Sequence, residues 1–340
     1  MKSQLLSRDE FRESVFKRDG YKCVFCDKRV ADAHHIIEKR LWKDSGYYLN
    51  NGASVCEDHH IQCEQTKISI EQIREACKIL KPIIPEHLYD DEIYDKWGNI
   101  ILANGQRLKG ELFFDESVQR ILKDSLFLFT DRVKYPRTNH LPWSENMNDD
   151  DRMIDSLDGF VGKRVIVTEK MDGENSTMYR DFIHARSVAG GSHPTRDWVK
   201  NFWSSFSHEI PEGWRICGEN LWAKHSIHYK KLPTYFLGFS IWNERNECLS
   251  WDDTIDWFKL LGITHVPILY DGVWDEKKIK TLFDNNNWET QEGYVCRIAG
   301  KFPYGDFKKV VAKFVRGGHI QTTKHWMHGQ PIERNLALVK

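Results

Sequence analysis

The spacing of apolar residues changes along this chain, from a helical period near the start to short strand-like runs later. Residues 8–20, RDEFRESVFKRDG, place Phe11, Val15 and Phe16 on one face of a helix that ends at an Asp-Gly pair. Residues 70–80, IEQIREACKIL, are also typical of a helix. The pattern therefore predicts helices at both ends of the first eighty residues.

The helical pattern breaks after residue 80. The segment KPIIPEHLYDDEIYDKWGN contains two prolines and an acidic run, which indicates a boundary between domains. Apolar and polar residues then alternate around Asn104-Gly105, and this predicts a small hairpin. We therefore expect three parts: a module over residues 1–80, a linker with the hairpin over 81–129, and a larger domain over 130–340.

Short strand-like runs dominate the larger domain. WRICGENLW, YFLGFSIW, TQEGYVCR and KKVVAKFVR each carry one charged or aromatic residue, as expected where strands gather functional groups in a cleft. These runs predict a mixed α/β domain built on antiparallel sheets. Together with VTEK and HARSVAGG, they supply Lys170, Arg186, Glu219, Phe239, Glu292 and Lys313.

The stretch VTEKMDGENSTMY, residues 167–179, ends an apolar run at Glu169-Lys170 and turns at Asp172-Gly173. One interpretation is a lysine at a sheet edge before a hairpin, since Asp-Gly is a strong turn signal. The other is that the strand holds the amine of Lys170 rigidly in a cleft, where it can act as a nucleophile. The functional residues on the other runs favour the second interpretation.

Composition narrows the class of protein. The 340 residues carry a formal net charge of -1, so nucleic-acid binding would have to use local patches rather than a basic surface. Thirteen tryptophans can serve both the core and the stacking of bases. The sequence opens without a signal peptide and has no apolar run long enough to span a bilayer. We therefore expect a cytoplasmic protein with no membrane partner.

Cysteines and histidines cluster near the start of the chain. Cys23 and Cys26 form a CxxC pair, and Cys56 and His59 form a CxxH pair thirty residues later. Two such pairs can surround one Zn²⁺ ion with sulfur and imidazole ligands. Scattered buried cysteines are the alternative, but the paired spacing favours zinc.

Four further residues, His34, His35, Asn51 and His60, remain outside that zinc set. Their order over residues 8–70 resembles the HNH endonucleases. Their ββα-metal fold puts a doublet on a hairpin strand, an asparagine in the loop and a histidine on the helix. The resemblance implies that His35 activates water as general base and that Asn51 orients its ring. It also implies that His34 and His60 hold a catalytic divalent ion.

This module departs from the common HNH pattern. His59 stands where a cysteine is more usual in the zinc set, and His34 stands where many relatives have aspartate. Asn50 also adjoins Asn51, which leaves the asparagine assignment open by one residue. The alternative is a zinc module that binds nucleic acid without cutting it.

The larger domain resembles the covalent nucleotidyltransferases, which comprise RNA ligases, DNA ligases and mRNA capping enzymes. KMDGEN matches their KxDG nucleophile motif, EGYV the fourth motif and AKFVR the fifth. Five such elements occur in order over residues 130–340. The upstream KYPRTNHLPWS and the tail VRGGHIQTTKHW are similar to the Deinococcus-type RNA ligases, so RNA ligase is favoured over capping enzyme.

This resemblance implies a covalent mechanism. Lys170 would attack the α-phosphorus of ATP, and its amine must lose a proton to do so. Lys313 would contact the α-phosphate, and its charge would help to lower the pKa of Lys170. Glu292 would lie near the phosphate and a divalent ion, Mg²⁺ or Mn²⁺. The AMP would then pass to a 5′-phosphate end, which a 3′-hydroxyl attacks to seal the strand.

The resemblance also assigns the nucleotide contacts. Glu219 would bind the ribose hydroxyls and Phe239 would stack on adenine. Glu169 would help to read the adenine edge. Arg186 would engage a phosphate of the nucleic-acid strand.

The fifth motif departs from the family, because Val311 occupies the first position of the common K-x-K pair. The phosphate contact then depends on Lys313, with Lys308 or Lys309 as candidates for the second cation. About 27 residues follow Lys313, too few for the C-terminal OB domain of DNA ligases and capping enzymes. That length also favours an RNA ligase.

The predicted protein is thus a ββα-metal zinc module followed by a nucleotidyltransferase, working in nucleic-acid repair. Its cofactors would be ATP, Mg²⁺ or Mn²⁺, and Zn²⁺. Its partner would be nicked or broken RNA, an RNA–DNA hybrid or duplex DNA. The alternatives are a ligase with a non-cleaving zinc module and a capping-type enzyme that uses GTP.

Overall fold

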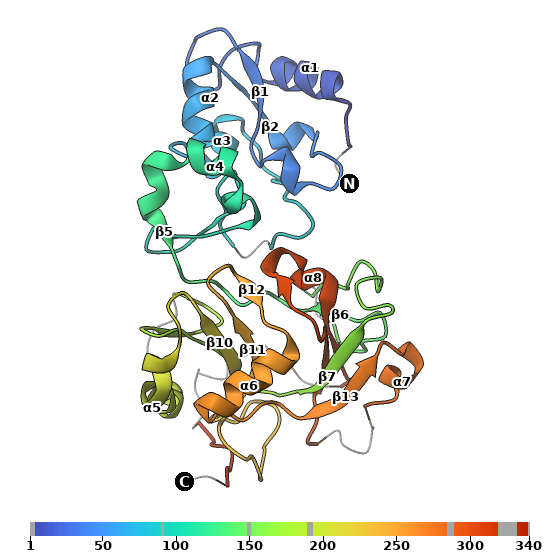
Figure 1. Ribbon diagram of the computed structural model, residues 1–340. Coiled ribbons are helices and arrows are strands. Elements are labelled where there is room, and N and C mark those ends of the chain that lie inside the picture. The colour runs from blue at the N-terminus through green and yellow to red at the C-terminus, as the bar shows by residue number, and fades with distance from the viewer. Residues whose placement is uncertain are drawn as a thin grey trace. The chain divides into compact units, whose positions relative to one another are not determined.

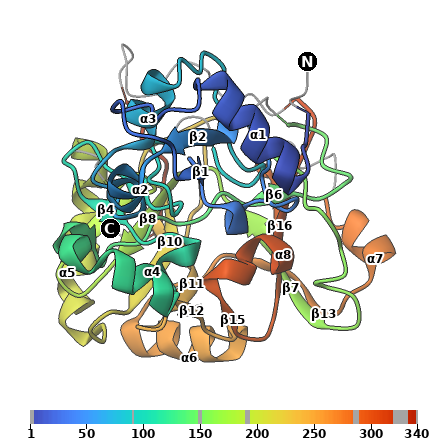
Figure 2. The same ribbon diagram turned by 90° about the horizontal axis from the view of Figure 1, so that it is seen from above.

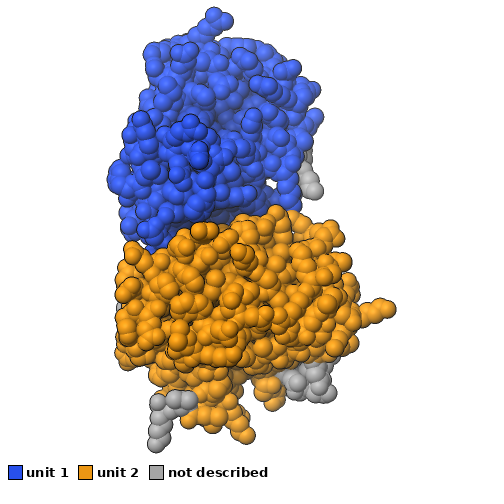
Figure 3. Space-filling view, viewed as in Figure 1, with its two compact units in different colours: residues 1–133 blue, residues 134–340 orange. Residues whose placement is uncertain are grey.

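The computed structural model describes residues 4–89, 92–147, 151–188, 193–283, 289–318 and 332–338. The chain forms two compact units, residues 1–133 and 134–340, which Figure 3 colours separately. Residues 319–326 of the tail motif lie outside the described residues. Among the described residues, no helix has the length and apolar character needed to cross a membrane.

The first unit begins with the predicted helix, α1 (Arg8–Arg18), which a capping box between Ser7 and Glu10 starts. Its predicted face is confirmed, because the buried residues are Phe11, Val15 and Phe16. Strands β1 (Asp32–His35) and β2 (Gly52–Val55) pair antiparallel and are followed by α2 (Glu57–Glu64), as Figure 1 shows.

Gly52 lets α1 pack closely against β2. A Cβ atom at this position would come within 2.4 Å of the Val15 side chain and 2.8 Å of the Phe11 ring. Only glycine fits this contact without displacing the helix. The packing fixes β1 and β2 under α1, with His34 opposite Ala53 and His35 opposite Gly52.

The helix predicted over residues 70–80 is shorter in the structure. It runs as α3 (Ile70–Ala76), and Lys78 has a φ of 55°, which no continuing α-helix can adopt. The predicted hairpin around Asn104-Gly105 is confirmed by the pairing of β3 and β4. The remaining elements of the unit are η1 (Lys39–Leu41), η2 (Leu49–Asn51), β3 (Ile100–Ile101), β4 (Arg107–Leu108), η3 (Glu111–Phe114), α4 (Glu116–Ile121), η4 (Lys123–Leu128) and β5 (Phe129–Thr130).

Two sheets form the second unit and confirm the mixed α/β architecture on antiparallel sheets. The first has the order β13-β7-β14-β16-β6, and the second has the order β15-β12-β11-β10-β8-β9. Their strands are β6 (Asn139–His140), β7 (Arg164–Lys170), β8 (Glu174–Met178), β9 (Ile183–Ala185), β10 (Arg215–Asn220), β11 (Phe236–Trp242), β12 (Glu247–Cys248), β13 (Ile268–Val273), β14 (Gly293–Ile298), β15 (Phe302–Pro303) and β16 (Val311–Val315). The named pairs are antiparallel except β16 with β6.

The two sheets share a core to which both contribute fully buried side chains, such as Val165 and Val167 of β7, Trp242 of β11 and Tyr294 of β14. Helix α6 (Trp251–Leu261) covers the other face of the second sheet, against β11, as Figure 2 shows. The other helices among the described residues of the unit are η5 (Pro194–Arg196), α5 (Asp197–Phe206), η6 (Ser207–Glu209), α7 (Glu276–Lys280), η8 (Tyr304–Asp306) and α8 (Phe307–Val310).

The chain crosses from one sheet to the other directly after Lys170. Strand β7 lies between β13 and β14, whereas β8 pairs with β9 and β10 in the second sheet. The interpretation of an edge lysine before a hairpin is therefore wrong. At the crossing, a Cβ on Gly173 would lie 2.5 Å from the Asn220 carbonyl oxygen, so the turn passes very close to β10.

Candidate active site and metal centres

A cavity of about 670 Å³ lies in the second unit, with walls from both sheets. Its volume falls in the range of small-molecule sites. Residues of β7, β8, β10, β11, β14 and β16 contribute side chains to it. Six of the predicted residues line the cavity: Glu169, Lys170, Arg186, Glu219, Phe239 and Lys313.

Lys170 ends β7, and its Nζ lies 2.6 Å from Oε2 of Glu292. Glu292 itself is buried and directly precedes Gly293, the residue that pairs with Lys170 across β7 and β14. The sheet register therefore brings together two residues that are 122 positions apart.

The pKa of Lys170 lies above its ordinary value. Burial by itself lowers this pKa, but the charges of Glu292 and Asp172, and that of Glu219 when it is ionised, together outweigh burial. In the protein without nucleotide, the positive charge of Lys313 therefore does not bring the pKa of Lys170 below its ordinary value. Lys170 is a charged ammonium group in this state, and its carboxylate neighbours must be neutralised before it can act as a nucleophile.

Lys313 projects from β16, where its Nζ lies 3.0 Å from Oδ1 of Asp151. His140, which faces Lys313 across the parallel β16–β6 pair, has its Nε2 3.2 Å from the same oxygen. Burial lowers the pKa of Lys313. Lys308 and Lys309, the candidates for a second phosphate contact, lie in α8 and are not among the residues that line the cavity.

Two of the glutamates that line the cavity, Glu219 and Glu169, have raised pKa values. Burial raises the pKa of Glu219, on β10, to about 8. Burial also raises the pKa of Glu169, on β7, to about 7. A protonated carboxyl group can donate a hydrogen bond, so both residues can offer a donor as well as an acceptor to a ligand near neutral pH.

The raised pKa of Glu169 can be tested by measuring how the stability of the protein depends on pH. Its pKa is higher in the folded than in the unfolded chain, so its contribution to stability is complete below about pH 4.5 and is lost as the pH rises through about 7. We expect Glu169→Gln to unfold a few degrees above the wild type at pH 8. The difference in unfolding temperature between the variant and the wild type, measured by calorimetry, should be smaller at pH 5. Glu212→Gln, on an exposed residue, is the matched control. A gap that does not change with pH would contradict the assignment.

Phe239 and Arg186 complete the predicted set. Phe239 lies on β11, half-buried, with the ring of Tyr135 edge-on at 5.2 Å. Arg186 follows β9 and is exposed at the cavity. His225 and Asp151 are among the lining residues that were not predicted. Asp151 belongs to an acidic run with no distinguishing pattern, and His225 stands in the loop after β10 without a paired motif.

In the first unit, the four predicted zinc ligands converge. The ligand atoms of Cys23, Cys26, Cys56 and His59 all lie within 4.8 Å of one another. The Sγ atoms of Cys26 and Cys56 are 3.8 Å apart. Nδ1 of His59 lies 3.4, 3.6 and 3.2 Å from the sulfurs of Cys23, Cys26 and Cys56 respectively. A tetrahedron with Zn–S of about 2.3 Å and Zn–N of about 2.1 Å has edges of about 3.6–3.8 Å, so these residues fit zinc.

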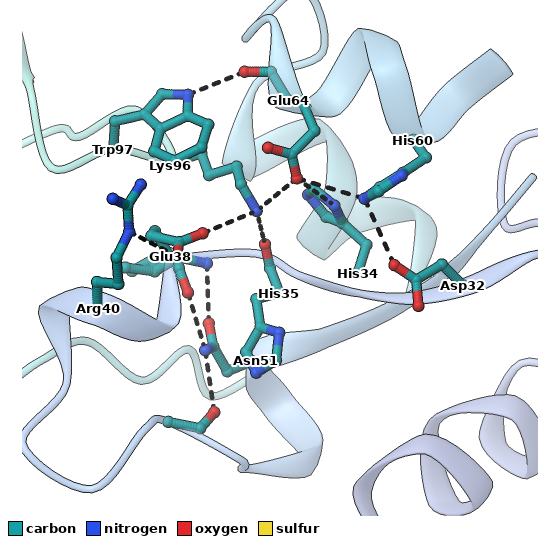
Figure 4. Close-up of polar contacts among 12 residues, drawn as sticks. Asp32, His34, His35, Glu38, Arg40, Asn51, His60, Glu64, Lys96 and Trp97 are labelled. Atoms are coloured by element: carbon teal, nitrogen blue, oxygen red, sulfur yellow. Dashed lines mark hydrogen bonds and ion pairs between the residues drawn. The ribbon is translucent and has the colours of Figure 1, made fainter. Parts of the chain in front are cut away.

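A second cluster in the same unit joins His34, His60 and Glu64 (Figure 4). Oε1 of Glu64 lies 3.4 Å from Nδ1 of His34 and 3.3 Å from Nε2 of His60. Glu64 was not predicted, although it stands four residues after His60 on α2, the spacing that puts two side chains on one helical face. Burial, and then the charge of Lys96, hold the pKa of His34 well below its usual range.

His35 adjoins this cluster on β1. Its ring stacks on Phe11 at 4.7 Å, and among the described residues no group forms a hydrogen bond with its Nε2. Burial, and then the charges of Lys96 and Lys39, lower the pKa of His35 to about 4. The imidazole is therefore neutral at pH 7, as a general base must be before it accepts a proton.

Asn51 does not hold the ring of His35. Its Nδ2 donates to the carbonyl oxygens of Ile37 and Gly46, both at 3.1 Å, and its Oδ1 accepts from the Ile37 amide at 2.9 Å. Asn51 thus fixes the segment after β1, and the predicted ring contact is corrected to a backbone one. Asn50 instead donates to the Lys81 carbonyl oxygen at the surface, so Asn51 is the buried asparagine.

Comparison with known proteins identifies part of the second unit. Residues 163–315 match the family model of RNA ligases, and this stretch is a domain of that family. It contains β7 to β16 and every predicted residue of the cavity. A comparison with curated protein sequences found no match.

Solved structures of ligases are similar to the chain at low identity. A variant of the Naegleria gruberi RNA ligase with ATP and Mn shares 18% identity over 55% of this chain and 56% of that chain, with a TM-score of 0.40. The Naegleria gruberi RNA ligase with PPi shares 22% identity over 55% and 56%, with a TM-score of 0.41. An archaeal ATP-dependent RNA ligase shares 15% identity over 76% of this chain and 64% of that chain, with a TM-score of 0.41. The matched region spans little more than half of the Naegleria chains.

Proposed function

We propose that the second unit is an ATP-dependent polynucleotide ligase, acting on RNA, in which Lys170 forms a covalent bond to AMP. The observation that carries the proposal is the position of Lys170 at the end of a central strand, in a cavity of about 670 Å³ within the RNA ligase domain. A strand fixed on both sides holds the amine in one place, which favours attack on a bound phosphate.

In the first step, Nζ of Lys170 attacks the α-phosphorus of ATP. A phosphorus–nitrogen bond forms, the bond to the β-phosphate oxygen breaks, and pyrophosphate leaves. The lysine gives up a proton, and Oε2 of Glu292 lies 2.6 Å away, within reach of it. Lys313 supplies positive charge for the α-phosphate, while Glu219 and Glu169 offer hydrogen bonds to the nucleoside.

The carboxylates around Lys170 fit a divalent cation, because Mg²⁺ and Mn²⁺ prefer oxygen ligands. A bound cation would neutralise charge on the triphosphate. It would also compensate Glu292, Asp172 and the ionised form of Glu219, the groups that raise the pKa of Lys170. Deprotonation of Lys170 is thereby tied to the arrival of nucleotide and cation.

In the later steps, AMP moves from Lys170 to a 5′-phosphate end, so that the phosphorus–nitrogen bond breaks and a phosphoanhydride forms. A 3′-hydroxyl then attacks the 5′-phosphate and AMP leaves. Arg186, exposed beside the cavity, would contact a phosphate of the strand. The substrate would be nicked or broken RNA, an RNA–DNA hybrid or a DNA duplex.

The test is the intact mass of the purified protein after incubation with ATP and Mg²⁺ or Mn²⁺, and in parallel with GTP. An AMP adduct supports the ligase. A GMP adduct in place of it would favour the capping-type alternative. No adduct with either nucleotide would overturn the proposed nucleotidyl transfer.

We propose as a second function that the first unit is a metal-dependent HNH-type nuclease, with both activities serving nucleic-acid repair. The order β1, β2, α2 and the cluster of His34, His60 and Glu64 support this proposal. Two imidazole nitrogens and one carboxylate oxygen suit Mn²⁺ or Zn²⁺ better than Mg²⁺, which prefers oxygen ligands alone. The four-residue zinc set would then be purely structural.

The nuclease is tested by His35→Ala. We expect cleavage of a duplex in the presence of Mn²⁺ to fall by about 10²–10⁴-fold, since a general base contributes that much. His87→Ala, on another histidine of the same unit, should cleave as the wild type does. Cleavage that persists in His35→Ala would contradict the assignment. A wild type that binds the duplex but never cuts it would favour the non-cleaving zinc module.

A further inference from the structure

A buried lysine from the segment after residue 80 reaches the His34–His60–Glu64 cluster. Nζ of Lys96 lies 3.0 Å from Oε1 of Glu64 and donates to the carbonyl oxygen of His35 at 2.8 Å (Figure 4). Its side chain is only 3% exposed. One ammonium group therefore bridges α2, which carries Glu64, and β1, which carries His35.

The backbone around Lys96 is fixed in place. The Glu38 amide donates to the Lys96 carbonyl oxygen at 3.0 Å, and Nε1 of Trp97 donates to the Glu64 carbonyl oxygen at 2.9 Å. Asp95, the residue before Lys96, is buried and accepts hydrogen bonds from the Trp97 amide and from Asn99. These contacts fix the backbone of Lys96 beside the cluster, and its buried side chain reaches into it.

Charge gives Lys96 two opposing effects on the cluster. A carboxylate that is partly removed from water is costly without a positive partner, and Lys96 supplies one to Glu64, whose side chain is 22% exposed. The same ammonium lies beside an oxygen that a divalent cation would also contact, and like charges at such a distance repel strongly away from water.

We propose that Lys96 is a positioning residue and an internal counter-ion for a divalent-cation site formed by His34, His60 and Glu64. It holds Glu64 in its place when no cation is bound, and it raises the cation concentration that the site needs. This inference rests on the proposed use of the cluster as an ion site. It also assigns the segment around Lys96 to the functional module, where the sequence predicted a linker.

Binding of Mn²⁺ to the full-length, zinc-loaded protein tests the inference, measured from the electron paramagnetic resonance signal of the free ion. The portion of binding that Glu64→Gln removes is assigned to this site. We expect the site to fill in Lys96→Met at a Mn²⁺ concentration on the order of tenfold lower than in the wild type. Without Mn²⁺, the variant should unfold several degrees lower. Lys43→Met, which removes an exposed lysine near Glu86, is the matched control.

Three results separate the possible failures. Equal or weaker Mn²⁺ binding by Lys96→Met would overturn the counter-ion role. A wild type with no Mn²⁺ binding sensitive to Glu64→Gln would overturn the ion site itself. If Lys96→Met does not fold, the double variant Lys96→Met/Glu64→Gln removes both charges. It should regain most of the stability lost in the single variant, because Glu38, 3.7 Å from Nζ of Lys96, still has Arg40 as a partner. No recovery would overturn the pairing.

Discussion

Lys170→Ala is expected to abolish the AMP adduct and with it strand joining, by roughly 10⁵-fold or more, because removal of a nucleophile leaves little residual catalysis. The pairing of β7 with β14 places the amine of Lys170 against Glu292, and alanine leaves no amine at that position. The measurement is intact mass with ATP and a divalent cation, followed by sealing of a nicked duplex.

Lys163→Ala is the matched control for Lys170. Lys163 directly precedes β7 at the end away from the cavity, and it is exposed. Its replacement should leave adduct formation unchanged. A second measurement uses a strand that already carries AMP on its 5′-phosphate. Lys170→Ala should seal that strand, since the step that needs the amine has been bypassed. An AMP adduct on Lys170→Ala itself would assign the nucleophile to another residue.

Sequence patterns located those parts of the sites that lie close together in the chain or on single strands. The CxxC and CxxH pairs each span one turn, so spacing alone brings each pair toward a common point. Lys170 was identified by the turn motif beside it. The structure adds the partner that no spacing shows, because Glu292 meets Lys170 through the register of two strands far apart in sequence.

Residues that join a site from other segments escaped prediction. Lys96 lies beyond the boundary that the prolines after residue 80 suggested, yet its side chain enters the cluster of His34 and Glu64. Asp151 contacts Lys313 across 162 positions. Glu64 is different, since its position four residues after His60 was a usable signal. Tertiary packing brings in the other two, and a single sequence carries no trace of it.

The fold shows the same limit at Asp172-Gly173. The turn signal was correct locally, because the chain does bend there. A hairpin also requires the flanking strands to pair, and pairing depends on which apolar faces meet in the core. Strand β7 is buried along most of its length and pairs on both sides with β13 and β14, so β8 pairs elsewhere.

Loss of one zinc ligand is the other change with a large expected effect. We expect Cys56→Ser to lose zinc and to unfold the region from Cys23 to Glu64, since zinc contributes on the order of 10 kcal/mol to such sites. Cys56 directly follows β2 and is the N-cap of α2, so its metal bond ties the strand to the helix. Zinc content by elemental analysis and hydrogen exchange of β1, β2 and α2 measure the effect.

Cys77→Ala separates zinc loss from general damage to the first unit. Cys77 is a buried cysteine of the same unit that lies outside the set of four ligands. Its replacement removes core packing, at about 1 kcal/mol for a side chain reduced by one atom, but should leave zinc fully bound. Retention of zinc by Cys56→Ser would overturn the four-residue site. The AMP adduct of the second unit should form in both variants, because the residues that line that cavity all lie beyond residue 133. Loss of the adduct together with zinc would instead mean that the two units fold as one.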